Sequence, residues 1–448
     1  MEYCYYYYYL FSSSRRRFYS SSSSSSLLLF LILLSVFVFP TTFVASIGIN
    51  YGQIANNLPL PDKVVPLLKS VGVTRVKLYD ADPKVLRAFA NTGIEFVVGL
   101  GNEYLSTMKD QSKAEDWVKS NVQCYLPATK ITCITIGNEV LTFNDTSLTG
   151  SLLPAMQNIH SALVTLGLDK QVTVTTAHSL AVLETSYPPS AGAFRKDLRG
   201  CISQILKFQS QTGSPILINA YPYFAYKANP KQVSLDYVLF QPNQGVLDPT
   251  TNLRYDNMLF AQVDAVHAAL TSMGYKKLPV LISETGWPSK GDEDEAGATE
   301  ENAMKYNGNL MKMLSQKKKI GTPMRPDCDL DVYVFALFNE NLKPGPLSER
   351  NYGLFKPDGT PVYQLATTTS ATNGGGGNST GKGGGADDDD DGGDTDHTPS
   401  SPASSANDYL SFSSATCTPW APGLDVHPQH RMNELVPCPA LPCPALHM

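Results

Sequence analysis

The fold is best predicted from one stretch, LPVLISETGWPS, which occupies residues 278–289. The apolar run from Leu278 to Ile282 is typical of a buried β-strand. Ser283 and Glu284 follow this run directly, and residues 286–288 then begin a loop. The stretch therefore places one carboxylate where a hydrophobic strand meets a loop, which is where a catalytic acid would lie.

A second segment has the same form. Ile131 to Ile136 is an apolar run, and Gly137-Asn138-Glu139-Val140 ends it with another carboxylate. Glycosidic bond cleavage needs such a pair, because one carboxyl protonates a poor leaving group while the other supplies negative charge or a nucleophile. A single glutamate after a strand is ordinarily a solvated loop residue. Two on one scaffold indicate a glycosidase.

Eight short apolar runs recur along the chain and have the composition of buried parallel strands. They are Ile47–Tyr51, Val76–Tyr79, Phe96–Leu100, Ile131–Ile136, Val172–Thr176, Ile216–Ala220, Val280–Ile282 and Val332–Phe338. Helix-forming stretches lie between them, such as 83–91, with Asp82 as the expected N-cap before Pro83, and 257–273. Eight strand and helix repeats over about 300 residues predict an α/β fold, a (β/α)8 TIM barrel. An open doubly wound sheet is the alternative, but no Gly-rich phosphate loop follows the first run to favour it.

The order of the strands predicts where the two carboxylates meet. Glu139 follows the fourth predicted strand and Glu284 follows the seventh. The strands of a parallel barrel all end on one face, which carries the active site. We therefore expect the two residues to converge across the barrel mouth, and a retaining glycosidase would hold their carboxyl groups about 5 to 5.5 Å apart.

Six motifs along the chain are highly specific when taken together. They are Ile47-Gly48-Ile49-Asn50-Tyr51-Gly52, Val76-Lys77-Leu78-Tyr79-Asp80, Gly137-Asn138-Glu139-Val140, Asn219-Ala220-Tyr221-Pro222-Tyr223-Phe224, Glu284-Thr285-Gly286-Trp287-Pro288-Ser289, and Phe338-Asn339-Glu340-Asn341 with Glu349-Arg350-Asn351-Tyr352-Gly353. Through them the segment from Ile47 to about Leu365 resembles the plant glycoside hydrolases of family 17, the endo-1,3-β-glucanases. The resemblance implies that Glu139 is the general acid/base and Glu284 the nucleophile.

The resemblance also covers residues around this pair. It implies that Asn138 hydrogen-bonds the sugar 2-hydroxyl, a contact that strengthens in the transition state. Tyr221, at the end of the sixth strand, could donate to Glu284 and hold it ionised. Three residues after the eighth strand are expected to form an ionic cluster near the acid/base, with a surface salt-bridge network as the alternative. They are Glu340, Lys343 and Glu349.

Five aromatic residues lie at or just after strand ends, where ring faces can stack on pyranose rings. For any one of them ordinary packing is an equal alternative, but as a set on one rim they favour a sugar-binding groove. They are Tyr51, Tyr79, Phe224, Trp287 and Phe338.

The mechanism implied is a double displacement. Glu284 attacks the anomeric carbon, Glu139 protonates the leaving oxygen, and Glu139 then acts as base toward water. The substrate expected is 1,3-β-glucan in cell walls, such as callose. Mixed-linkage 1,3;1,4-β-glucan hydrolysis, transglycosylation and non-catalytic glucan binding are the alternatives. Wall remodelling, callose turnover and plant defence all use this chemistry, and the sequence does not choose among them.

Composition limits the partners. The net charge is −6, which argues against a polyanionic ligand, and no basic stripe indicates nucleic-acid binding. The seven histidines are scattered, and no Cys or His spacing is that of a zinc site. We therefore expect no metal, no cofactor and no protein partner, and a monomer.

Residues 1–46 have the features of a secretory signal peptide. Arg15-Arg16-Arg17 precedes the apolar run Leu27–Phe39, and small residues follow at Val44-Ala45-Ser46. We expect secretion to the cell wall or apoplast. The apolar run is short for a membrane span, so an uncleaved anchor is the lesser alternative. The glycosyl hydrolase barrel would then occupy residues 47–366.

Residues 367–448 are rich in Gly, Ser, Thr and Pro and contain Asp387–Asp391, which predicts a low-complexity, disordered tail. Residues 419–448 lack the terminal apolar segment that a lipid-anchor signal requires, so the sequence leaves anchoring undecided. An anchored form would lie on the outer face of the plasma membrane. Glycosylation sequons begin at Asn144 and Asn378. Four cysteines are interpreted mainly as buried small hydrophobes, namely Cys124, Cys133, Cys201 and Cys328.

Overall fold

The computed structural model describes residues 47–143, 145–316 and 320–365. The predicted signal peptide, the predicted tail, Asn144 and Asn378 therefore lie outside the described residues. None of the helices in these ranges has the length and apolar character that a membrane span needs.

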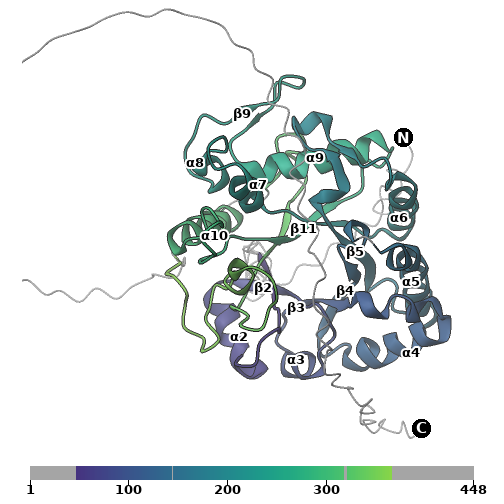
Figure 1. Cartoon of the computed structure of the whole chain (residues 1–448). Helices are drawn as coiled ribbons and strands as arrows, with labels where there is room; N and C mark the ends of the chain where they lie inside the picture. The colour runs from purple at the N-terminus through teal and green to yellow at the C-terminus, as the bar shows by residue number, and fades with distance from the viewer. Residues whose placement is uncertain (1–46, 144, 317–319, 366–448) are drawn as a thin grey trace, which may run out of the picture. The chain divides into compact units, whose positions relative to one another are not determined.

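Eight parallel strands close into a barrel, as the sequence predicted. The strands are β1 (Ile47–Asn50), β2 (Val73–Lys77), β3 (Glu95–Leu100), β4 (Lys130–Asn138), β5 (Thr173–Ser179), β8 (Ile216–Asn219), β11 (Val280–Thr285) and β12 (Asp331–Val334). Their order around the barrel is β1-β12-β11-β8-β5-β4-β3-β2, and each neighbouring pair is parallel. Figure 1 shows α3, α4, α5 and α6 following one another along one side of these strands.

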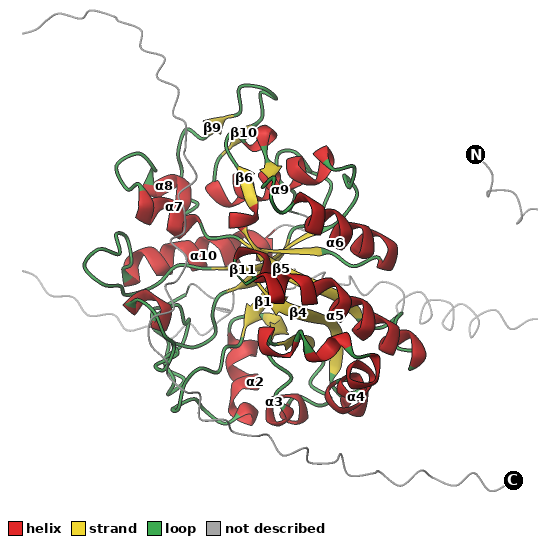
Figure 2. Ribbon diagram, turned by 45° about the vertical axis from the view of Figure 1, so that its right-hand side comes forward, coloured by secondary structure: helices red, strands yellow, loops and turns green. Residues whose placement is uncertain are grey.

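Helices enclose the strands (Figure 2). The α-helices are α2 (Pro61–Ser70), α3 (Pro83–Ala88), α4 (Gln111–Asn121), α5 (Thr146–Thr165), α6 (Arg199–Thr212), α7 (Pro222–Ala228), α8 (Leu235–Val238), α9 (Met258–Ser272) and α10 (Glu300–Gln316). Short 3-10 turns are η1 (Asn102–Tyr104), η2 (Thr107–Lys109), η3 (Gln123–Tyr125), η4 (Val140–Thr142), η5 (Leu180–Val182), η6 (Pro189–Ala191) and η7 (Leu347–Arg350). Two hairpins, β6 (Leu183–Thr185) with β7 (Ala193–Phe194) and β9 (Val246–Leu247) with β10 (Arg254–Tyr255), are added to the barrel.

Two predicted helix starts are confirmed. Asp82 caps α3 and accepts hydrogen bonds from the amides of Lys84 and Val85. Asn257 caps α9 and accepts from the amide of Phe260. Each cap satisfies backbone donors that the first turn of a helix leaves unpaired.

The segment that follows β12 forms no α-helix within the described residues. Between β12 and Leu365 the described chain contains only the turn η7 and loops. Pro344, Gly345 and Pro346 interrupt this segment, and proline lacks the amide that a helix interior needs. The backbone instead returns along the end of β12, where the amides of Leu354 and Phe355 donate to Ala336 and Leu337.

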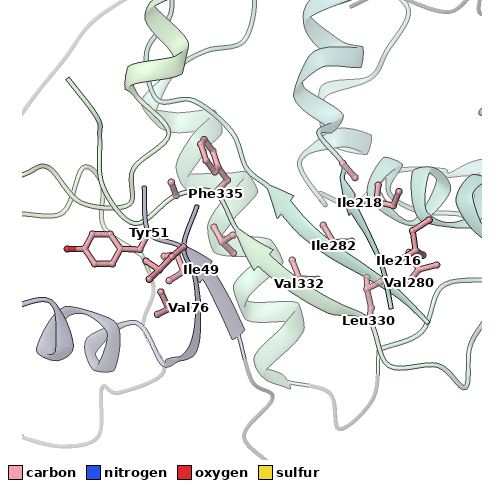
Figure 3. Close-up of a cluster of buried hydrophobic side chains, with 14 of the residues drawn as sticks. Ile49, Tyr51, Val76, Ile216, Ile218, Val280, Ile282, Leu330, Val332 and Phe335 are labelled. Carbon is pink, nitrogen blue, oxygen red and sulfur yellow. The ribbon is translucent and has the colours of Figure 1, made fainter. Parts of the chain in front are cut away.

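The core has two parts. One continuous cluster of buried apolar side chains joins the strands to α2, α3 and α4 and the later helices. Figure 3 shows part of its strand side, where Ile49 lies beside Val76, and Val332, Ile282 and Ile218 continue the layer along the following strands. Burial of this layer provides the main driving force for folding.

A smaller cluster fills the barrel interior. Val97, Cys133 and Tyr333 pack together with Leu281, although β3 and β4 lie opposite β11 and β12 in the strand order. Their contact therefore crosses the lumen. Gly48 faces the same space, because a Cβ there would overlap the Tyr333 ring.

The interpretation of the four cysteines as buried small hydrophobes is confirmed only for Cys133. Cys133 is buried in the lumen, whereas Cys124, Cys201 and Cys328 are partly exposed. The last three lie outside the strands, in turns and at helix ends, where the barrel does not cover them fully.

We predict that Phe96→Ala lowers the free energy of unfolding by about 3–5 kcal/mol, because it leaves a cavity in the core. Phe96 on β3 is fully buried and meets Phe89 edge-to-face, with ring centroids 5.2 Å apart. Denaturant unfolding measures the change. Val164→Ala is the control, since Val164 on α5 is half exposed and its truncation should change stability by less than about 0.5 kcal/mol. Equal effects of the two substitutions would contradict the packing described here.

Candidate active site

Irregular ends of two barrel strands bring the carboxylates to the mouth. The register of β4 shifts between Thr135 and Asn138, and that of β11 shifts between Ile282 and Glu284. Side chains alternate between faces in a regular strand, but a shift of this kind re-aims them. As a result, Ser283 contacts Asn219 on the neighbouring strand β8, whereas Glu284 contacts Lys77 on β2, which is not adjacent to β11.

Glu284 is buried and held by three donors. Its Oε1 accepts from Lys77 Nζ at 2.9 Å and from the Tyr79 hydroxyl at 2.7 Å. Its Oε2 accepts from the Tyr221 hydroxyl at 3.0 Å, which is the contact expected from the sequence. Burial by itself raises the pKa of Glu284, but the charge of Lys77 and the hydrogen bonds from Tyr79 and Lys77 outweigh it and lower the pKa. Glu284 is therefore ionised.

Asn50 on β1 orients the lysine. Its Oδ1 accepts from Lys77 Nζ at 3.3 Å, and its Nδ2 donates to the backbone oxygens of Ser283 and Val334. Sequence reasoning assigned no role to Asn50 or Lys77, although both lie in quoted motifs. The signal in the sequence was a lysine within a predicted buried strand, because a buried lysine is rare unless it is paired.

Glu139 lies directly after β4 in a left-handed backbone conformation, with φ 56°. Few residues other than glycine adopt this conformation. The Glu139 amide donates to the Ala177 oxygen of β5 at 2.8 Å, which fixes the backbone in place. Strained backbone of this kind is concentrated at functional sites.

The Glu139 carboxyl has the opposite electrostatic environment to Glu284. Burial, followed by the nearby charge of Glu284, raises the pKa of Glu139 to about 7, although Asn219 and Lys77 oppose the shift. Glu139 is therefore protonated in mildly acidic solution, whereas Glu284 is not.

Asn219 on β8 links the two carboxylates. Its Nδ2 donates to Glu139 Oε1 at 2.8 Å, and its Oδ1 accepts from the Ser283 hydroxyl at 2.5 Å. Its backbone is also paired in register with Glu284 on β11. Glu139 and Glu284 thus lie on two sides of the same asparagine, which confirms that they converge at the mouth.

The side chain of Asn102 holds the backbone of Asn138 through two hydrogen bonds. Asn102 Oδ1 accepts from the Asn138 amide at 2.8 Å, and Asn102 Nδ2 donates to the Asn138 oxygen at 3.1 Å. The Asn138 side chain accepts from Asn219 at 3.3 Å. Beside these residues is a cavity of about 330 Å³ at the ends of β2, β3 and β4. Lys77, Tyr79, Asn102 and Asn138 are among the residues that line it.

The expected ionic cluster is present. Lys343 Nζ lies 3.1 Å from Glu349 Oε2 and 4.2 Å from the Phe335 ring centroid. Glu340 is buried and accepts from the Ile54 amide at 2.8 Å. Burial foremost raises the pKa of Glu340, and Lys343 opposes it. These side chains are largely covered, so the cluster is not a surface network.

The cluster acts on Glu139 and Glu284 through its charge. Lys343 contributes to the lowered pKa of Glu284, and Glu349 contributes to the raised pKa of Glu139. A Cβ at position 52 would overlap the Glu340 carboxylate, so a larger residue there would have to displace that side chain.

The stacking role expected of three aromatic residues is wrong. Trp287 is fully buried, and its indole nitrogen donates to the Gly297 oxygen at 2.7 Å. Tyr51 and Phe338 are also buried and pack on each other, with centroids 5.8 Å apart. All three rings belong to the main buried apolar cluster of the protein. Rings around Trp287 are Tyr223, Tyr226 and Tyr306.

The other two aromatic residues differ from each other. Phe224 on α7 is 37% exposed, so its ring is accessible. Tyr79 is half-buried, with Lys77 Nζ 4.1 Å from its ring centroid and its hydroxyl on Glu284. Tyr79 therefore both donates a hydrogen bond to Glu284 and lines the cavity.

Within the described ranges, no three His, Cys, Asp or Glu side chains are grouped so as to hold a metal ion.

We predict that Lys77→Met raises the pKa of Glu284 and lowers the free energy of unfolding by about 3–5 kcal/mol, because a buried carboxylate loses its counter-charge. Carbon-13 NMR titration of the glutamate carboxyls and denaturant unfolding measure the two changes. Lys113→Met, at an exposed position on α4, is the control and should alter neither. An unchanged Glu284 pKa would show that the tyrosines alone keep it ionised.

Comparison with known proteins assigns the family. The model described as Glycosyl hydrolases family 17 matches residues 47–367. Glucan endo-1,3-beta-glucosidase 11 of Arabidopsis thaliana is 66% identical over 334 residues, 75% of this chain and 78% of that protein. Glucan endo-1,3-beta-glucosidase 10 of the same plant is 67% identical over 334 residues, 74% of this chain and 78% of that protein.

Solved structures agree. CJP38, described as a beta-1,3-glucanase and allergen of Cryptomeria japonica pollen, is 41% identical with a TM-score of 0.69, covering 72% of this chain and 100% of that one. A structure from work on two plant beta-glucan endohydrolases with distinct substrate specificities is 37% identical with a TM-score of 0.65, covering 71% and 99%. With the family model spanning the whole barrel, this chain belongs to glycosyl hydrolase family 17.

Proposed function

We propose that this glycoside hydrolase cleaves internal 1,3-β-D-glucosidic linkages with retention of configuration. One observation carries the proposal: two carboxyl groups on either side of Asn219 are held in opposite ionisation states. Pairs of carboxyls whose environments push their pKa values apart are typical of an acid and a nucleophile. The relatives' names support 1,3-β-glucan as the substrate.

The reaction is a double displacement. Ionised Glu284 attacks the anomeric carbon, and Glu139 gives its proton to the departing glycosidic oxygen. A covalent glucosyl-Glu284 intermediate forms while the reducing-end part of the glucan leaves. Glu139, now a carboxylate, takes a proton from water, which attacks the same carbon and releases Glu284. Two inversions give retention.

The neighbouring residues serve defined steps. Lys77, Tyr79 and Tyr221 keep Glu284 ionised before attack. Asn219 orients the Glu139 carboxyl, and Asn138, fixed by Asn102, would bind the sugar 2-hydroxyl. Phe224 offers an accessible ring on the same face of the barrel for further sugar units.

We also propose that the enzyme acts outside the cell, on cell-wall glucan such as callose in the wall or apoplast. The arginines at 15–17 and the apolar run at 27–39 support export. A monomer suffices in this proposal, because one chain supplies every residue of the site described above.

The test of the reaction uses a linear 1,3-β-glucan and follows the product anomers by proton NMR in the first turnovers. We expect short β-anomeric products, and none from Glu284→Ala. Azide should restore cleavage by this variant and yield an α-glucosyl azide, because it attacks from the vacated side. Glu139→Gln should lose about 10²- to 10⁴-fold in kcat, and azide should give it a β-glucosyl azide.

Products of α configuration from the wild type would contradict retention. Cleavage of mixed-linkage 1,3;1,4-β-glucan in preference to the linear polymer would replace the proposed substrate. Tight glucan binding without cleavage would support a binding protein instead. Glu293→Ala is the control, since Glu293 is exposed on the loop after β11.

The pH dependence of kcat/KM gives a further prediction. Glu139 must be protonated, so activity falls as the pH rises through about 7. The hydrogen bond from Asn219 lowers the pKa of Glu139, so Asn219→Ala should move this alkaline limb to higher pH while reducing kcat. Asn121→Ala on α4 is the control. An alkaline limb that stays in place would exclude Glu139 as the group that titrates there.

A further inference from the structure

Another buried carboxylate, Glu295, lies outside the catalytic pair. Its side chain is only 1% exposed, in the loop between β11 and α10. Oε1 accepts from Lys227 Nζ at 2.8 Å and from the Ser348 hydroxyl at 2.6 Å. Oε2 accepts from the amides of Ser348 and Asp292 at 2.9 and 3.0 Å. Four hydrogen bonds converge on this one group.

These bonds join three loops. Lys227 belongs to α7, which follows β8, while Asp292 and Glu295 follow β11 and Ser348 follows β12. Strands β8, β11 and β12 are neighbours in the barrel, and their carboxyl ends all open on the face that holds the site. Glu295 therefore connects three adjacent segments of the active-site rim.

The loop after β12 is held at both ends of η7. The Leu347 amide donates to Asp292 Oδ2 at 2.8 Å. At the other end, the amide and hydroxyl of Ser289 donate to the Asn351 oxygen at 2.8 and 3.0 Å. Residues 347–351 are thus fixed against the loop after β11, with Ser348 on Glu295 between these contacts.

This fixed segment and the residue that follows it carry two groups that act on the catalytic pair. Glu349, next to Ser348, pairs with Lys343 at 3.1 Å. Tyr352 packs edge-on against Tyr221, with centroids 5.9 Å apart, and Tyr221 donates to Glu284.

We propose that Glu295 is a positioning residue for the catalytic pair: by holding Ser348 it keeps Glu349 beside Lys343 and Tyr352 against Tyr221. The inference rests on the proposed roles of Glu139 and Glu284.

Glu295 itself does not switch in the working range of the enzyme. Burial by itself raises its pKa, but the bonds from Lys227, Ser348 and Asp292 outweigh burial and bring the pKa to about 2. The carboxylate therefore stays ionised in the range where Glu139 titrates, and Ser348 stays held.

The consequence for the acid/base has a definite sign. The groups whose charges or hydrogen bonds act on Glu139 are Glu284, Asn219, Lys77 and Glu349. The charge of Glu139 in turn contributes to the raised pKa of the Tyr79 hydroxyl. Among them Glu349 raises the pKa of Glu139. If Glu349 moves away when Glu295 is removed, the pKa of Glu139 falls and the alkaline limb of kcat/KM moves to lower pH.

The experiment compares Glu295→Ala, Glu349→Gln and the double variant in pH profiles on a linear 1,3-β-glucan. We expect both single variants to move the alkaline limb to lower pH, and the double variant to move it no further. For Glu295→Ala, kcat should also fall by about 10- to 100-fold, because the catalytic geometry loosens, with a smaller change in KM.

Glu295→Gln is a second variant, for the case that Glu295→Ala does not fold. It keeps the shape of the side chain and one acceptor oxygen, but its amide group faces a donor, so the limb should move by an intermediate amount. Glu293→Gln, on the same loop but exposed, is the matched control and should have the profile of the wild type.

Two results would overturn the proposal. The first is a loss of kcat that is equal at every pH, with the limb unmoved, which would make Glu295 a loop anchor only. The second is a double variant whose shift equals the sum of the single shifts, since the two residues would then act independently. If the wild type fails to cleave the glucan, the proposed function fails. NMR titration of the Glu139 carboxyl in the same variants then still decides the positioning role.

Discussion

The site depends on a charged pair inside the barrel, Lys77 with Glu284. Taking two charges out of water is unfavourable unless close contact and further hydrogen bonds compensate. Here Asn50 binds the lysine, and Tyr79 and Tyr221 bind the carboxylate. Burial, and after it the stabilised charge of Glu284, raises the pKa of Glu139. The ion pair thereby contributes to the difference in ionisation between the two carboxyl groups.

The closed barrel makes this arrangement available. Its lumen has an apolar layer around Tyr333, Val97 and Cys133 and, toward the carboxyl ends of the strands, the polar layer that contains Lys77 and Glu284. Irregularities at the ends of β4 and β11 interrupt the alternation of side chains. Loops after β8, β11 and β12 then surround the pair, and Glu295 connects these loops at a single buried point.

Much of the fold could be predicted, because buried parallel strands are continuous apolar runs and each of the eight produced one. The strand-end glutamates were equally visible. Tertiary packing decided the rest. Trp287 and Phe224 each lie a few residues after a strand end, yet the ring of Trp287 is buried and that of Phe224 is exposed. Neighbouring loops make that difference, and they come from distant parts of the chain. Lys77 and Asn219 were hidden for the same reason, since their partners lie on other strands.

By itself, then, the sequence determined the eight-stranded barrel, the position of Glu139 and Glu284 at the ends of its strands, and the chemistry that such a pair can perform. These features depend on local patterns, namely hydrophobic periodicity and residue type at a strand end. Only the tertiary structure shows how the two carboxyl groups come to differ in pKa, because burial and the charges of Lys77, Lys343 and Glu349 set those values. Those charges act on the two carboxyl groups through space, and they belong to residues far apart in the chain.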